Sequence, residues 1–296
     1  MLGLVGASGA GKSTLVRGVI QLLGHNGVTP VSLDDYHRYS RADLRARGLT
    51  HADPAANNLD LMAEHLATLR AGGTISKPRY DQRTGTLGDP EAVAATGLVI
   101  AYGMLTLTPP PLAGLFDLTV YLEPDQPMRQ AWRLARDVRE RGYTPDEVLA
   151  LRATRERDAA RFIAVQRPLA DLVVRFHNLP DGISAELLLR RHGDHDSLAP
   201  ALEALSAAPR PGLVLERAIT DDDGHRVDRL VIDPTIAPES AAAAATLIGA
   251  GLPGIGPAVL NLLGQVRLPN QALHNLPLAL TQLLIVRRML AVSGAK

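Results

Sequence analysis

The chain has 296 residues, of which 46% are hydrophobic and 21% charged, and its formal net charge is zero. This composition is typical of a globular protein with a sizeable core, and the zero net charge gives no general support for binding to nucleic acid or to a membrane surface. The absence of cysteine excludes disulfides, cysteine-ligated metals and cysteine nucleophiles. Because the sequence has neither a long apolar run nor a signal-peptide pattern, we expect a cytoplasmic protein without a membrane partner.

Apolar runs that are typical of buried strands alternate with helical segments from residue 1 to about residue 190. The predicted strands are Leu2–Val5, Val28–Leu33, Gly97–Ala101, Leu115–Leu122 and Leu172–Phe176. The predicted helices are Ser13–Leu23, Leu59–Ala71, Gln126–Arg141 and Thr144–Arg161, and Gly73–Gly88 is predicted to be a loop or a weak hairpin. The alternation predicts an α/β fold with a mostly parallel sheet and helices on both faces.

The composition changes towards the C-terminus. The apolar runs Leu213–Ile219 and Arg226–Ile232 flank an Asp-rich turn that ends at Gly224, which predicts a hairpin. An alanine-rich helix at Ala241–Ala250 and an apolar helix at Leu276–Val292 are expected to follow. We therefore predict a first domain over residues 1–208 and a smaller α+β portion over residues 209–296 that packs on it.

A glycine-rich segment follows the first predicted strand and leads into the first predicted helix. It fits the pattern G-x-x-x-x-G-K-[ST], whose backbone N–H groups surround the phosphates of a nucleotide. The expected phosphate-binding residues are Gly6, Ala7, Ser8, Gly9, Ala10, Gly11, Lys12, Ser13 and Thr14. Lys12 is expected to reach the β- and γ-phosphates of ATP, and the Ser13 hydroxyl to bind Mg²⁺. The motif does not decide the reaction, because ATPases, GTPases and metabolite kinases all carry it.

A second polar segment follows the second predicted strand and contains Asp34, Asp35, His37 and Arg41. In an open parallel sheet the carboxyl ends of the strands form the ligand-binding edge, so this segment should lie on the same side as the glycine-rich loop. A carboxylate there can take a proton from an attacking hydroxyl, and the cations can hold an anionic substrate. A solvated polar loop is the alternative interpretation.

Four charged residues gather on one predicted helix. Arg133, Asp137 and Arg141 are spaced four apart and share a face, with Arg136 beside them. Such a face can bind phosphates or can be a solvated, salt-bridged surface, and spacing alone does not distinguish the two.

Several of these segments, in the same order, resemble the phosphoribulokinase and uridine kinase family of P-loop kinases. The segments that carry the resemblance are Leu33–His37 with Arg41, Asp53–Met62, Lys77–Tyr80, Arg136–Gly142 and Leu278–Leu284. The similarity is strongest over residues 3–171. It favours the phosphoribulokinase branch, because uridine kinases are less alike in the second and last of these segments.

The resemblance implies transfer of the ATP γ-phosphate to the 1-hydroxyl of ribulose 5-phosphate. Asp34 would be the catalytic base, with Asp35 as the less favoured alternative, and Asp137 would assist at the metal or at the transferred group. The substrate-binding residues implied are His37, Arg41, Lys77, Tyr80, Arg133, Arg136 and Arg141. The cofactors implied are ATP and Mg²⁺, and the partner is a small sugar phosphate and not a nucleic acid. The expected assembly is a homo-oligomer, with a dimer favoured.

Two positions depart from the family pattern. Tyr102 stands where the family has a glutamate of the magnesium and nucleotide site, and Gln82 stands where a histidine is usual. A phenol, whose ordinary pKa is about 10, does not supply a carboxylate's charge at pH 7. Three interpretations stay open: an active phosphoribulokinase, a kinase for another pentose phosphate or a nucleoside, and a poorly catalytic ATP-binding regulator.

Overall fold

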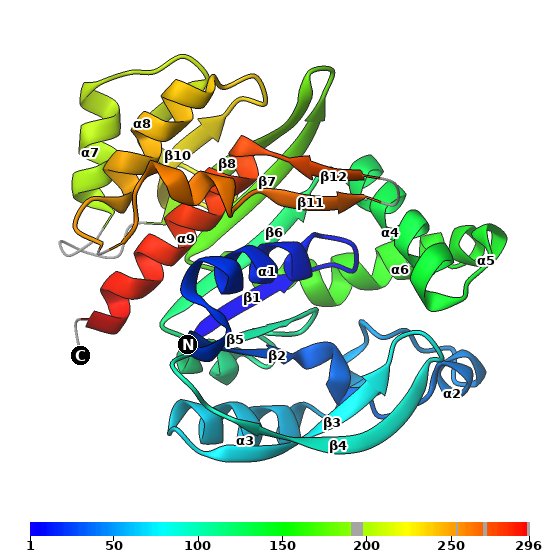
Figure 1. Ribbon diagram of the computed structural model, residues 1–296. Coiled ribbons are helices and arrows are strands. Elements are labelled where there is room, and N and C mark those ends of the chain that lie inside the picture. The colour runs from blue at the N-terminus through cyan, green and yellow to red at the C-terminus, as the bar shows by residue number, and fades with distance from the viewer. Residues whose placement is uncertain (191–197, 253, 269–270, 295–296) are drawn as a thin grey trace. The chain divides into compact units, whose positions relative to one another are not determined.

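The computed structural model describes residues 1–190, 198–252, 254–268 and 271–294 (Figure 1). The chain divides into two compact units. The first contains Met1–Lys12, Asn26–Leu122 and Gln126–Ala170, and the second contains Ser13–His25, Glu123–Asp125 and Asp171–Lys296. The domain boundary predicted at residue 209 stays a prediction.

A parallel sheet forms the centre of the first unit. Its strands run in the order β2, β5, β1, β6, and each neighbouring pair is parallel. Their bounds are β1 Leu2–Gly6, β2 Val28–Ser32, β5 Leu98–Gly103 and β6 Leu118–Pro124. All five residues of β1 are buried, as expected of a central strand covered on both faces. The predicted α/β fold is confirmed.

One helix and one hairpin pack together in the first unit (Figure 1). Helix α3 spans Leu59–Arg70, and the antiparallel strands β3 and β4 span Thr74–Asp81 and Thr86–Ala94. Buried apolar side chains of α3, β2, β3 and β5 form one cluster that includes Leu66, Val31, Ile75 and Val99. The loop or weak hairpin predicted at residues 73–88 is therefore a longer hairpin, with a register shift between Lys77 and Arg79.

The other helices of the first unit are α2 Arg41–Ala46, α4 Gln126–Arg141, α5 Pro145–Ala150 and α6 Arg152–Asp158. The single helix predicted at Thr144–Arg161 is wrong, because the chain breaks at Leu151 into α5 and α6 and continues as a π-turn at Ala159–Ile163. Its predicted start is confirmed, since Thr144 and Glu147 form a reciprocal capping box.

Short 3₁₀ turns occur in both units. They lie at His25–Gly27, Leu33–Tyr36, Pro54–Ala56, Pro110–Leu115, Ala164–Leu169 and Pro257–Asn261.

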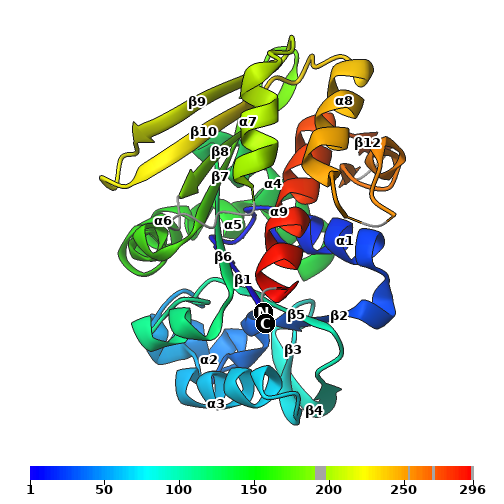
Figure 2. The same cartoon turned by 90° about the vertical axis from the view of Figure 1, so that its left-hand side faces the viewer.

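The second unit contains an antiparallel run of strands in the order β7, β8, β10, β9 (Figure 2). The strands are β7 Leu172–Leu179, β8 Gly182–Arg190, β9 Leu213–Thr220, β10 Arg226–Ile232, β11 Gln265–Leu268 and β12 Gln271–His274. The helices are α1 Lys12–Leu23, α7 Ala199–Ala207, α8 Pro238–Gly249 and α9 Leu276–Gly294. The predicted hairpin is confirmed as β9–β10, with Gly224 at φ +81°. Strands β8, β11 and β12 and helix α7 were not predicted.

Helix α9 is tied to helix α1 by one glutamine. The Gln282 side chain donates to the Thr14 carbonyl at 3.2 Å and accepts from the Gly264 N–H at 2.8 Å. A Cβ atom at Gly18 would lie 2.1 Å from the side-chain nitrogen of Gln282, so a larger residue there would displace the Gln282 amide. Among the described residues, no helix combines the length and the apolar character that crossing a bilayer requires.

Candidate active site

The glycine-rich loop has the conformation that the motif predicts. Gly9 and Gly11 adopt φ values of +88° and +92°, which are accessible to glycine and strained for other residues. The Lys12 ammonium folds back and donates to the carbonyls of Gly6 at 2.7 Å and Ala7 at 3.2 Å. The Lys12 ammonium therefore lies against the backbone oxygens of its own loop.

The positive charge of the Lys12 ammonium is poorly compensated by nearby acidic side chains. Burial lowers the pKa of Lys12 to about 8; Asp34 opposes this change, while Arg136, Arg141 and Arg133 add to it. A triphosphate would supply the negative charge that these side chains do not, so the loop fits the expected ATP.

Gly9 also determines how closely α4 packs on the loop. A Cβ atom there would lie 3.0 Å from the Arg129 carbonyl and 3.1 Å from the Arg133 Cβ, whereas a Cβ at Gly11 meets nothing within 4 Å. We expect Gly9→Ala to lower the free energy of unfolding by about 2–4 kcal/mol, from overpacking added to backbone strain. Gly11→Ala is the matched control and should lose only about 1 kcal/mol from strain. Chemical denaturation without ATP measures both, and equal losses would contradict the packing argument.

The adjacent carboxylates Asp34 and Asp35 have different surroundings. Asp35 accepts from the Lys77 ammonium at 2.5 Å and from the Tyr80 N–H at 3.2 Å. Asp34 lines the open cleft, and its one hydrogen bond in the described part of the chain comes from the Met104 N–H at 3.3 Å. Asp34 therefore has an oxygen available to a substrate, whereas both oxygens of Asp35 are occupied.

Lys77 and Tyr80 lie behind the cleft wall. Lys77 is buried and forms a second ion pair with Glu91 at 2.8 Å. Tyr80 is buried as well, and its hydroxyl lies 3.0 Å from Nε2 of His51. Neither lines the cleft, so the direct contact with the acceptor that we expected of them stays a prediction.

Asp137 is the centre of an arginine cluster in the first unit. Its side chain is 1% exposed and lies within 4 Å of four guanidinium groups. The N···O distances are 3.4 Å to Arg133, 2.7 Å to Arg136, 3.7 Å to Arg141 and 3.5 Å to Arg155. Burial favours the neutral acid, but the arginines, Arg136 first, outweigh it and hold the pKa of Asp137 below its ordinary value. Asp137 is thus an anionic hub for these cations.

Two of these arginines reach other parts of the site. The second terminal nitrogen of Arg136, Nη2, donates to the Ser8 hydroxyl at 3.0 Å and so binds the glycine-rich loop. Burial lowers the pKa of Arg133 to about 10, Arg155 adds to that change, and Asp137 opposes it. The cluster therefore has more positive charge than its own acid compensates.

Arg41 joins three segments of the first unit. Its guanidinium donates to the carbonyls of Arg141 at 3.0 Å and Gln82 at 2.7 Å, and lies 4.5 Å from the centre of the Tyr143 ring. Arg45 and Arg155 also lie over that ring, at 5.7 and 5.2 Å. Tyr143 therefore separates three like charges with an aromatic surface that attracts cations.

These residues surround one open cleft in the first unit. The lining arginines are Arg41, Arg45, Arg129, Arg133, Arg141 and Arg155. The lining carboxylates are Asp34 and Asp137, and the lining histidines are His37 and His51. The structure thus brings Asp34, His37, Arg41, Arg133, Asp137 and Arg141 together, as the sequence predicted. Our sequence reasoning did not assign a role to Arg129, Tyr143 or Arg155, although Arg129 lies one helical turn before Arg133.

Tyr102 is the second-last residue of β5, which lies between β1 and β2. It pairs with Leu4 on one side and Ser32 on the other. Burial raises the pKa of Tyr102, and Asp34 and Asp35 raise it further, so the phenol is neutral at pH 7. The metal ligand that the sequence predicts is the Ser13 hydroxyl, and oxygen ligands of this kind suit Mg²⁺. Magnesium itself stays a prediction.

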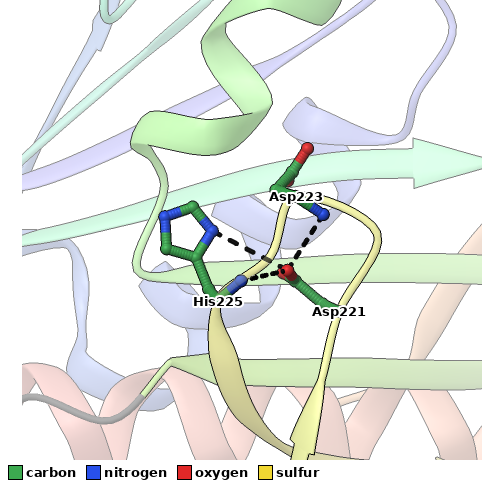
Figure 3. A group of neighbouring side chains, drawn as sticks. All are labelled: Asp221, Asp223 and His225. Atoms are coloured by element: carbon green, nitrogen blue, oxygen red, sulfur yellow. Dashed lines mark hydrogen bonds and ion pairs between the residues drawn. The ribbon is translucent and has the colours of Figure 1, made fainter.

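A second group of possible metal ligands lies in the β9–β10 turn of the second unit. The ligand atoms of Asp221, Asp223 and His225 lie within 4.8 Å of one another (Figure 3). Asp221 already accepts from the backbone N–H groups of Asp223 and His225, and Arg190 lies 3.5 and 3.0 Å from the two aspartates. These contacts stabilise a turn and neutralise its charge, so we assign the group a structural role.

Comparison with known proteins assigns the part of the chain that contains the cleft to one family. Residues 1–181 match the phosphoribulokinase / uridine kinase family. The chain is 38% identical over 175 residues to a phosphoribulokinase of Synechocystis sp., covering 59% of this chain and 53% of that protein. It is 32% identical over 213 residues to a uridine kinase of Deinococcus deserti, covering 71% of this chain and 95% of that protein. The chain spans about half the length of the plant and cyanobacterial phosphoribulokinases that it matches.

A solved structure, phosphoribulokinase from Rhodobacter spheroides, aligns with a TM-score of 0.60 over 78% of this chain and 89% of that one. At 18% identity this likeness shows the fold alone. The matches in sequence, together with the glycine-rich loop and its arginine cluster, show that the chain belongs to the phosphoribulokinase / uridine kinase family, whose members are ATP-dependent kinases of small molecules.

Proposed function

We propose that the protein transfers the γ-phosphate of ATP to the 1-hydroxyl of ribulose 5-phosphate. The observation that carries this proposal is the cleft itself, which is lined by six arginines and by two carboxylates, Asp137 and Asp34, of which Asp34 has an available oxygen. Such an excess of cations suits an acceptor that already carries a phosphate. An uncharged nucleoside would bring no further anion to Arg133, Arg141 and Arg155, which share the single carboxylate of Asp137.

The residues of the cleft divide the work of phosphoryl transfer. ATP supplies the phosphoryl group, and Mg²⁺ held with the Ser13 hydroxyl would offset the charge of its phosphates. Asp34 removes the proton of the attacking hydroxyl, and Lys12 stabilises the charge on the transferred group. Arg41, Arg133 and Arg141 orient the acceptor.

Asp137 takes a different part from the one that the family resemblance implied. Four guanidinium groups surround its carboxylate, so it is not placed to hold a metal. We assign it to positioning the arginines that face the cleft, since a fixed geometry of charged groups is a large part of catalysis in phosphoryl transfer.

The neutral Tyr102 favours a second candidate function, an ATP-binding protein with little turnover. Loss of one charge-assisted contact to the transferring group or its metal commonly lowers turnover by about 10²–10³-fold. The retention of both Lys12 and an Asp34 carboxylate with an available oxygen favours the active enzyme.

A coupled ADP-release assay with Mg-ATP tests the proposal. We expect turnover of at least about 1 per second with ribulose 5-phosphate, in the range of ordinary kinases, and none with ribose 5-phosphate or uridine. The Asp34→Asn protein serves as the background control. Turnover with uridine alone would assign the chain to the uridine kinase branch. No turnover with any acceptor, alongside clear ATP binding, would favour the second candidate, with Tyr102→Glu as the variant expected to gain activity.

A further inference from the structure

Two backbone carbonyls fix the orientation of the buried Asn57 side chain. Its Nδ2 donates to the carbonyl of Asp53 at 2.7 Å and to that of His51 at 3.1 Å. Carbonyl oxygens only accept hydrogen bonds, so the amide nitrogen must face them. The amide oxygen, Oδ1, therefore points the other way, towards His37.

Asn57 in turn determines which ring nitrogen of His37 carries a hydrogen. Nδ1 of His37 lies 2.7 Å from Oδ1 of Asn57 in a buried contact, and residues 37 and 57 are held side by side by an antiparallel backbone bridge. Because Oδ1 can only accept, Nδ1 must be the donor. In a neutral imidazole the other nitrogen, Nε2, then carries a lone pair.

The surroundings of His37 keep its ring neutral and in place. Burial lowers the pKa of His37 and outweighs the opposing effects of its acidic and amide neighbours. The groups that face it are Asp34, Asn57 and Asp35, which raise the pKa, and Arg141, which lowers it. The rings of His51 and Tyr80 lie nearly perpendicular to it, at centroid distances of 4.2 and 4.9 Å.

His37 lines the cleft, and among the residues that the structure describes none forms a hydrogen bond with its Nε2. We propose that Asn57 is a positioning residue that holds His37 in the Nδ1-protonated tautomer, so that Nε2 accepts a hydrogen bond from a hydroxyl of the acceptor. The acceptor half of this inference rests on the proposed kinase function. His37 then binds a sugar hydroxyl of the acceptor and not its phosphate, because a lone pair cannot donate to phosphate oxygens. The family resemblance implied only that His37 binds the substrate.

The tautomer can be measured directly on the full chain labelled with ¹⁵N-histidine. Two-bond ¹H–¹⁵N spectra at neutral pH distinguish protonated from unprotonated ring nitrogens, and His37→Gln identifies the signals of His37. We expect the Nδ1-protonated form in the wild type and a mixed or reversed form in Asn57→Ala. Asn57→Asp should keep the tautomer, since a carboxylate also only accepts, and should raise the imidazolium fraction.

Steady-state kinetics test the second half of the inference, the hydrogen bond from a hydroxyl of the acceptor to Nε2 of His37. Asn57→Ala should raise KM for ribulose 5-phosphate by about 5- to 100-fold and change KM for ATP by less than about 2-fold, as expected when a buried acceptor loses its orientation. The neighbouring Asn58 is the matched control: its side chain accepts a hydrogen bond from the Arg38 guanidinium, and Asn58→Ala should change neither KM. One monodeoxy analogue of the substrate should show the same loss with the wild type and no further loss with Asn57→Ala.

A wild-type His37 in the Nε2-protonated form would overturn the inference whatever the kinetics, and so would an unchanged acceptor KM in a folded Asn57→Ala. If no acceptor is phosphorylated at all, that result counts against the proposed function, and the spectra still decide whether Asn57 fixes the tautomer.

Discussion

Asp34→Asn is expected to lower kcat by about 10²–10⁴-fold, the usual contribution of a general base. The asparagine keeps the size of the side chain and the bond from the Met104 N–H, so the fold should be unaffected. ATP should bind with nearly unchanged affinity, because the phosphate contacts of the glycine-rich loop remain. ADP release measures the first effect, and calorimetric titration with ATP measures the second.

Asp35→Asn is the matched control one residue away. Because Asp35 holds the Lys77 ammonium at 2.5 Å and the Tyr80 N–H at 3.2 Å, its loss should mainly lower the free energy of unfolding by leaving a buried ammonium poorly paired. A folded Asp35→Asn that loses more turnover than Asp34→Asn would transfer the role of base to Asp35. Loss of ATP binding in Asp34→Asn would also contradict the assignment of Asp34 as general base, because that role predicts a nearly unchanged affinity for ATP.

Asp137→Asn is expected to lower the free energy of unfolding by about 3–5 kcal/mol, since it leaves several partly buried guanidinium groups without their shared anion. The lowered pKa of Asp137 determines the pH range over which its carboxylate stabilises the folded protein. Its stabilisation is full above the ordinary aspartate pKa of about 3.9 and is lost only as the pH falls below it. The difference between wild type and variant should therefore be constant from about pH 5 to 8 and shrink in acid.

Thermal unfolding with increasing inorganic phosphate makes this test more specific. Phosphate can replace the missing charge of the Asp137 carboxylate, so it should reduce the difference in Tm between the wild type and Asp137→Asn. Glu147→Gln is the control: it removes an exposed ion pair with Arg45, keeps a residue suited to the capping box, and should change Tm far less. An Asp137→Asn protein as stable as the wild type at pH 7 would show that the arginines do not depend on this carboxylate.

Local signals explain the parts of the fold that the sequence predicted well. The bounds of α4, Gln126–Arg141, were predicted to the residue, because its charged periodicity ends at a glycine. The break in the next helix was missed because Leu151 gives no local sign of it. Leu151 adopts φ −83° and ψ −5°, a conformation open to any residue, and neither glycine nor proline marks the position.

The structure brings several of the proposed site residues to one cleft and leaves Lys77 and Tyr80 out of its lining, and the roles proposed for them stay predictions. The sequence placed Asp34 and Asp35 side by side without a physical reason to choose between them, and the difference arises from Lys77, which is 42 positions away from Asp35. The same holds for Arg155, which reaches Asp137 from another helix. Such choices depend on long-range packing, which residue spacing does not encode.

The sharing of one carboxylate by four arginines also restricts how this site can evolve. A substitution at Arg133, Arg136 or Arg141 disturbs the neighbours that depend on the same anion, so its effects will not add to those of a second change in the cluster. Adaptation to a different acceptor should therefore begin at cleft residues that do not touch Asp137, such as Arg45, Thr50 and His51. Among descendants of this chain, those three positions should change first, while the arginines around Asp137 should stay unchanged together.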